Sequence, residues 1–139
     1  MPDNTPNPDE VWAMLTRLVM YSRDPWRRAA SERTGLSFGR IRVLRRLRNG
    51  PMTVKELAYA AAIDAPAATV AVNQLEELGY VVREVDPTNR RQKLVSITMD
   101  GRAVLAQALA TPDPAPDSVA ALPPDDLRTL RDILSKIEH

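Results

Sequence analysis

Apolar residues recur at helical spacing along most of the chain, and the most organised stretch runs from residue 53 to residue 98. Thr53 is followed three residues later by Glu56, the spacing of a capping box, in which each side chain satisfies a free backbone donor of the first helical turn. A helix is therefore predicted from this point. Its apolar side chains share one face: Val54, Leu57, Ala58 and Ala61.

A second helix is predicted directly after a short turn at Ile63 and Asp64. Asp64 is a good N-cap, and Pro66 is tolerated in a first turn because its missing N–H has no intrahelical partner there. Gly79 is expected to end the helix in the left-handed conformation. The side chains expected to face inward are Ala68, Val72, Leu75 and Leu78.

Two strands are predicted next, because residues 80–85 are rich in β-branched side chains and residues 94–98 alternate well enough to pair with them. The segment between them, DPTNRRQ, is turn-forming and basic. A helix-turn-helix followed by a basic hairpin is a winged helix. In such a unit the second helix enters a major groove, and the hairpin reaches the neighbouring backbone or minor groove.

Further helices surround this stretch, so the predicted fold is mostly α with a small β-hairpin wing. Residues 1–8 have no apolar periodicity and are expected to form a disordered tail, and three alternate prolines at 112–116 interrupt the chain. Residues 9–139 are then one domain. The expected parts are a winged helix at about 37–98 and dimerisation helices at about 9–34 and 99–139.

The first and last helices have apolar faces that a small domain does not need at its surface. Each could pack against its copy in a second subunit, and the alternative is that both fold back on their own domain. A homodimer is favoured because two-fold operators suit two-fold proteins. The residues concerned are Val11, Leu15, Leu18, Val19, Leu127, Leu130, Ile133, Leu134 and Ile137.

Composition argues against an enzyme. The chain has 139 residues, no cysteine and one histidine, His139, so thiol chemistry is excluded and neither a metal site nor a cofactor is expected. No apolar run reaches membrane-spanning length and no signal-peptide pattern is present, so no membrane partner and a cytoplasmic location are expected. The net charge of +1 hides nine arginines against two acids between Arg23 and Arg48, a distribution that suits a polyanionic partner.

The order of these segments resembles the MarR family of bacterial transcriptional regulators. The matching pieces are LSFGRIRVLRRL, MTVKELAYAAAIDAPAATVAVNQLEELGYVVRE, DPTNRRQKLVSITMDGRAVL and LPPDDLRTLRDILSKI. DPTNRR stands in the place of the family's Asp-Pro-x-Asp-Arg-Arg wing pattern, with Asn89 where the second Asp is usual. The resemblance implies a homodimer that binds double-stranded DNA at a pseudo-palindromic operator, usually as a repressor, and that a small aromatic ligand often releases.

Candidate DNA contacts fall on the second helix and the wing. For base readout we expect the outward face of the helix, with Asn and Gln suited to adenine and the small apolar groups to the thymine methyl, hence an A·T-leaning site. For phosphate and minor groove we expect the basic wing residues Arg90, Arg91 and Lys93. The base-reading residues are Pro66, Ala67, Thr69, Val70, Asn73 and Gln74, and further possible phosphate contacts are Ser37, Arg40, Thr53 and Lys55.

Each of these assignments has a plainer alternative. The charged and amide residues could be merely solvated, and Ser37 and Thr53 are primarily helix caps. The nearly uncharged second helix also leaves open a protein-interaction module with weak or non-specific DNA binding. Arg83 is expected to brace the wing through Asp86 or Glu84. Four aromatic residues could line an effector pocket or simply be core: Trp12, Tyr21, Trp26 and Phe38.

Overall fold

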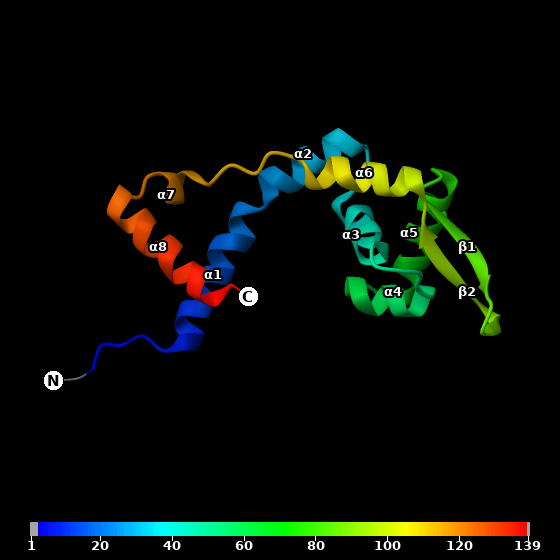
Figure 1. Ribbon diagram of the computed structural model, residues 1–139, viewed down its shortest axis with the longest axis horizontal. Helices are drawn as coiled ribbons and strands as arrows, with labels where there is room; N and C mark the ends of the chain where they lie inside the picture. The colour runs from blue at the N-terminus through cyan, green and yellow to red at the C-terminus, as the bar shows by residue number, and fades with distance from the viewer. Residues whose placement is uncertain (1–2, 139) are drawn as a thin grey trace. The chain divides into compact units, whose positions relative to one another are not determined.

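The computed structural model describes residues 3–138, and its elements follow the predicted order of helices and a hairpin (Figure 1). The expected tail falls partly outside the described residues, and residues 3–7 have no regular secondary structure. The elements are α1 (Pro8–Ser22), α2 (Asp24–Thr34), α3 (Phe38–Leu47), α4 (Val54–Ala61), α5 (Ala65–Glu77), β1 (Val81–Asp86), β2 (Asn89–Ile97), α6 (Met99–Leu109), α7 (Asp117–Ala120) and α8 (Pro124–Ile137). The fold class, mostly α with one antiparallel hairpin, is confirmed.

The chain divides into two compact units, residues 23–111 and residues 1–22 with 112–139. The larger unit contains α2 to α6 and the hairpin, so α2 and α6 belong with the winged helix rather than with the terminal helices. The assignment of residues 9–34 and 99–139 to dimerisation stays a prediction.

The core of the larger unit lies between its helices, α2 to α6, and the hairpin. Leucine and valine side chains fill it, which is the outcome expected when helices pack apolar stripes against one face of a hairpin. The largest fully buried side chains are Leu44, Leu47, Leu57, Leu75, Val43, Val72, Val81 and Val95. A short bridge in which Met52 N–H donates to Val95 O (3.1 Å) and Val95 N–H to Met52 O (2.7 Å) ties the hairpin to the start of α4.

The hairpin differs from the prediction in where its second strand begins. β2 starts at Asn89 rather than near residue 94, because pairing continues past a register shift between Val85 and Asp86. Val85 pairs with Lys93 whereas Asp86 pairs with Asn89, so residues 90–92 have no partner on β1. The basic residues of the tip therefore lie on a bulged strand and not in a loop.

The prediction that Leu78 faces inward is wrong, because its side chain is 55% exposed. It is the C-cap residue of α5, one position before Gly79, whose left-handed φ of 79° turns the chain into β1. The buried stripe of α5 ends at Leu75, so Leu78 lies beyond the part of the helix that meets the core.

In the smaller unit, α1 and α8 are helices as predicted, and neither contains a buried residue. The apolar faces of both are solvent-exposed, including Val11, Val19, Ile133 and Ile137. Residues 112–116 are not helical, in agreement with their prolines, and a short helix that the sequence analysis did not predict, α7, follows them.

Candidate nucleic-acid interface

Local capping sets the angle between α4 and α5. Thr53 Oγ1 accepts from Glu56 N–H (3.1 Å), and Thr53 N–H donates to Glu56 Oε1 (3.4 Å), so the predicted capping box is confirmed. α4 ends at Ala62, which has a left-handed φ of 57°, and Asp64 Oδ1 then accepts from Ala67 N–H (2.7 Å) to begin α5. The turn between the helices is thus only three residues long and capped at both ends.

This turn places α5 with one face against the core and the opposite face in solvent, beside the hairpin (Figure 1). Ala68, Ala71, Val72 and Leu75 are buried. The Thr69 hydroxyl donates to Ala65 O of its own helix (3.0 Å). All six side chains predicted for base readout are exposed: Pro66, Ala67, Thr69, Val70, Asn73 and Gln74. Their role in base readout stays a prediction.

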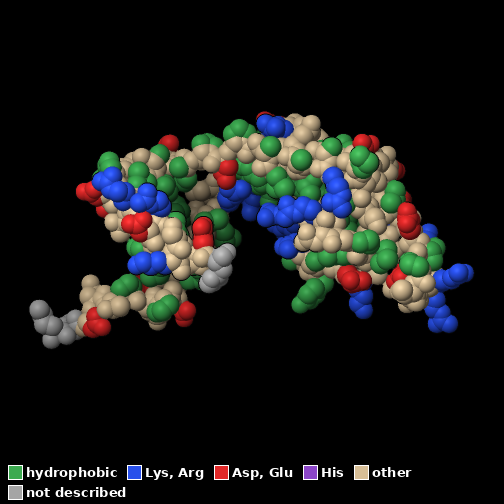
Figure 2. All heavy atoms as spheres, viewed as in Figure 1, with side chains coloured by type: hydrophobic (Ala, Val, Ile, Leu, Met, Phe, Trp, Pro, Cys, Tyr) green, Lys and Arg blue, Asp and Glu red, His purple; other side chains and the backbone are tan. Residues whose placement is uncertain are grey.

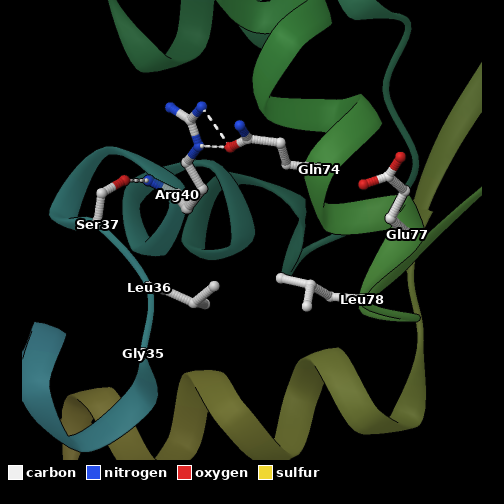
Figure 3. A pocket seen from close by; sticks show the side chains of 7 residues that line it. All are labelled: Gly35, Leu36, Ser37, Arg40, Gln74, Glu77 and Leu78. Carbon is white, nitrogen blue, oxygen red and sulfur yellow. Dashed lines mark hydrogen bonds between the residues drawn. The ribbon is translucent and has the colours of Figure 1, made fainter.

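Two arginines hold the two amide side chains of this face. From α3, Arg40 donates through Nε (2.9 Å) and Nη2 (2.6 Å) to Gln74 Oε1, and these side chains point toward each other in Figure 3. From β1, Arg83 Nη2 donates to Asn73 Oδ1. The sequence analysis did not predict these two contacts, because nothing local in the sequence connects residues that are 34 and 10 positions apart.

The prediction that Arg83 forms an ion pair with Asp86 or Glu84 is wrong. Its guanidinium pairs with Glu76 of α5 (Nε to Oε2, 3.6 Å) and not with Glu84 or Asp86. Glu84 follows Arg83 directly on the strand, where successive side chains point to opposite faces, so the two cannot readily meet. Arg83 consequently braces β1 against α5.

Asp86 organises the tip of the wing. Its carboxylate accepts from Gln92 Nε2 (2.8 Å), Thr88 N–H (2.9 Å) and the Thr88 hydroxyl (2.8 Å). The bond from Gln92, followed by those from Thr88, lowers the pKa of Asp86 from its ordinary value. Asn89 Oδ1 accepts from Arg91 N–H (3.2 Å), so Asn89 supports the backbone of the tip and not a guanidinium.

The three basic side chains of the wing are exposed, and Figure 2 shows Lys and Arg side chains gathered at the end of the hairpin. Within residues 3–138, no hydrogen bond or ion pair engages the side chains of Arg90, Arg91 or Lys93. Because Asp86 is already engaged with Thr88 and Gln92, the tip presents uncompensated positive charge to solvent.

The other predicted phosphate contacts lie at helix starts. Ser37 caps α3 by accepting from Arg40 N–H (3.3 Å), and Thr53 caps α4, so both hydroxyls have structural roles. Lys55 is exposed in the first turn of α4. Arg40 is half-buried and engaged with Gln74. Phosphate contact by any of the four stays a prediction.

Two of the four predicted effector-pocket residues come together. The rings of Trp26 and Phe38 meet edge to face, with centroids 6.0 Å apart and planes at 80°. They border a cavity of about 280 Å³ whose other lining residues are Ile41, Arg42, Arg45, Arg46 and Leu109. Trp12 and Tyr21 lie on α1 in the other unit, and both side chains are largely exposed.

Across residues 3–138, no cluster of three or more His, Cys, Asp or Glu side chains could hold a metal ion, and His139 lies outside this range. No helix in the same range has the length and apolar character needed to cross a membrane.

A capped helix-turn-helix with an exposed second helix, followed by a hairpin with free cations at its tip, defines a winged helix-turn-helix protein. The MarR family model matches residues 34–92 of this sequence. The crystal structure of a cysteine-to-serine mutant of MarR from E. coli has the same fold, with a TM-score of 0.69 and 26% identity, over 96% of this chain and 98% of that one. The match to the MarR family model therefore covers the winged-helix part of this chain, and the likeness in fold to MarR extends over nearly the whole of it.

Two further proteins are similar to this chain. The putative transcriptional regulatory protein for the hcr operon of Thauera aromatica is 35% identical over 74 residues, which are 52% of this chain and 45% of that protein. The same MarR mutant complexed with operator DNA matches with a TM-score of 0.62 and 24% identity over 96% of this chain and 100% of that one. The chain spans less than half the length of the curated relatives it matches. These proteins are described as transcriptional regulators and not as enzymes, which agrees with the expectation from composition.

Proposed function

We propose that this protein is a dimeric DNA-binding transcriptional regulator that represses transcription from a pseudo-palindromic operator. The observation that carries the proposal is the exposed face of α5 next to a wing whose cations Arg90, Arg91 and Lys93 have no partner among the described side chains. Duplex DNA offers a groove for such a helix and phosphates for such a wing. The complex of a MarR mutant with operator DNA, which has the same fold, supports this arrangement.

The proposal is tested by a mobility shift on the DNA that flanks the protein's own gene, across a salt series. Operator-selective binding with two half-sites about one helical turn apart is the expected result. Weak binding without sequence preference would instead favour a winged-helix module that binds another protein. The acidic residues Glu76 and Glu77 near the end of α5, and the absence of any basic residue on that helix, are the observations behind this alternative.

The exposed apolar faces of α1 and α8 support the dimer. Neither helix contains a buried residue, yet both have large apolar side chains, such as Trp12, Met14, Ile133 and Leu134, at the surface. Large apolar side chains exposed along two helices are typical of an interface. A second copy of the same two helices would cover them.

Changing Ile133 to Glu is expected to convert the dimer to a monomer, because the substitution places a charge in an interface that must lose its water. Light scattering after gel filtration would report half the wild-type mass. Ser135→Glu adds the same charge to α8 at a polar position and should leave the mass unchanged. A wild-type protein of monomer mass would contradict the dimer directly.

The cavity beside Trp26 and Phe38 supports an effector that is an aromatic carboxylate. Two aromatic rings suit a planar ligand, and Arg42, Arg45 and Arg46 around the same cavity suit an anion. Such a ligand would bind against the same residues that position α3, and α3 provides the Arg40 contact to α5.

Benzoate is the probe for this cavity. Its binding, measured by isothermal titration, is expected to weaken about tenfold in Arg45→Gln, since a hydrogen bond to a charged group contributes about 1.5 kcal/mol or more. Benzyl alcohol has the same ring without the charge, so any affinity it has should be equal for both proteins. Unchanged benzoate affinity in the variant would exclude Arg45 from the site.

A further inference from the structure

Both amide side chains on the exposed face of α5 are held by their oxygens. Gln74 Oε1 accepts two bonds from Arg40, and Asn73 Oδ1 accepts one from Arg83. A guanidinium has only donors, so the amide atom that faces it must be the carbonyl oxygen. The orientation of each amide is therefore fixed by chemistry, and each NH₂ group is directed away from its arginine.

Holding the amide oxygen changes which base edge the side chain can bond. A free Gln or Asn bonds adenine through two atoms, because its oxygen accepts from N6 while its nitrogen donates to N7. The two bonds from Arg40, at 2.9 and 2.6 Å, reach Gln74 Oε1 from one side and turn this oxygen toward α3. The Nε2 donors are left for a base, and Nε2 has no partner among the described residues.

Several features stabilise the contact between Arg40 and Gln74. Bonds from a charged donor are about twice as strong as neutral ones, and Arg40 bonds through two nitrogens at once. Arg40 lies in the first turn of α3, where the Ser37 cap fixes its backbone, and its side chain is half-buried. It borders a groove of about 450 Å³ between α3 and the end of α5, which Leu36 and Leu78 line on the other side (Figure 3). Arg83 is held in turn by Glu76 (3.6 Å).

We propose that Arg40 is a positioning residue that makes Gln74 a reader of guanine, and that Arg83 acts on Asn73 in the same direction. This rests on the proposed function, in which α5 lies in the major groove. Guanine presents two acceptors there, N7 and O6, whereas adenine presents one acceptor and one donor. A donor-only NH₂ group therefore favours guanine, and the A·T preference expected from free amides is replaced at these positions.

The test is selection of bound sites from a random duplex library, followed by competition binding at the base pair that Gln74 contacts. That pair is the one whose preference disappears in Gln74→Ala. For the wild type, guanine should exceed adenine there by about tenfold, within the range of a good two-bond contact. Arg40→Met removes the donors and frees the oxygen, so the preference should fall to parity or reverse toward adenine at that pair alone.

Two further variants separate positioning from a simple charge effect. Gln74→Glu keeps an acceptor for Arg40 but has no NH₂ group, so the guanine preference should disappear even though the contact to α3 remains. Arg33→Met removes an exposed arginine of α2, and it should leave base preference unchanged. In the Gln74→Ala background, Arg40→Met should have no further effect on base preference.

The outcomes distinguish this inference from the proposed function. A wild-type protein that selects no motif overturns both. A wild-type protein that selects a motif, together with an Arg40→Met variant that weakens all sequences equally, overturns the inference alone and makes Arg40 a phosphate contact. A shift in preference confined to the pair read by Gln74 supports it. Thermal melting of each variant shows that the fold is retained.

Discussion

Replacing Gly101 with alanine is expected to destabilise the protein by about 2 to 3 kcal/mol, the cost of forcing an extra methyl into a closed space. Gly101 lies in the first turn of α6. A Cβ added there would lie 2.1 Å from the carbonyl oxygen of Tyr80 and 2.8 Å from Ile97 Cγ1, which is too close for either atom. The backbone carbonyl cannot move aside, because Tyr80 O also accepts from Thr98 N–H (3.0 Å). The midpoint of thermal unfolding should fall by roughly 10 °C.

Gly39 provides the matched control. It lies in the first turn of α3, where an added Cβ would meet only Ser37 Oγ at 3.9 Å. Alanine is favoured over glycine in helices by about 1 kcal/mol, so Gly39→Ala should unfold at the wild-type temperature or above it. If Gly101→Ala behaved in the same way, the close approach of α6 to the start of β1 would be wrong.

The sequence predicted the parts of this fold that depend on a few adjacent residues. The caps at Ser37, Thr53 and Asp64 each bond a backbone N–H three residues ahead, so residue type and spacing suffice to find them. The apolar stripes of the helices were found for the same reason, because burial repeats with the helical period.

The parts that were missed depend on residues distant in sequence. The contact of Gln74 with Arg40 requires α3 and α5 to lie together, and no local pattern encodes their mutual position. The partner of Arg83 was misassigned because acids adjacent in the chain were considered while the acid across the packed helix, Glu76, was not. Similarly, Gly101 looks like a poor helix residue until Tyr80 is seen against it.

Residue types alone therefore predict only part of the candidate nucleic-acid interface. Exposure on α5 and positive charge on the wing follow from periodicity and turn chemistry, and the structure has both where expected. What a side chain such as Gln74 can offer to a base depends on which of its atoms other residues already occupy. That information is tertiary, and it changes the expected base preference even though the candidate residue remains the same.

Neutralising the wing by changing Arg90, Arg91 and Lys93 together to Gln is expected to lower operator affinity by about two to three orders of magnitude at moderate salt. Each phosphate contact contributes about 0.9 to the slope of log affinity against log salt, so losing three per wing should flatten the slope of a dimer by about five units. Binding would be measured by fluorescence anisotropy at several salt concentrations, on operator and on unrelated duplex.

The fold should survive this change, because the three side chains are exposed and no ion pair or hydrogen bond of the described structure engages them. Surface substitutions of this kind usually alter stability by less than about 0.5 kcal/mol. Arg33→Gln removes a charge from α2 and should leave the salt slope nearly intact, whereas Arg91→Gln alone should flatten it. Equal losses in these two single variants would mean that general charge attracts the DNA, and the wing would then have no specific role in contacting the phosphates.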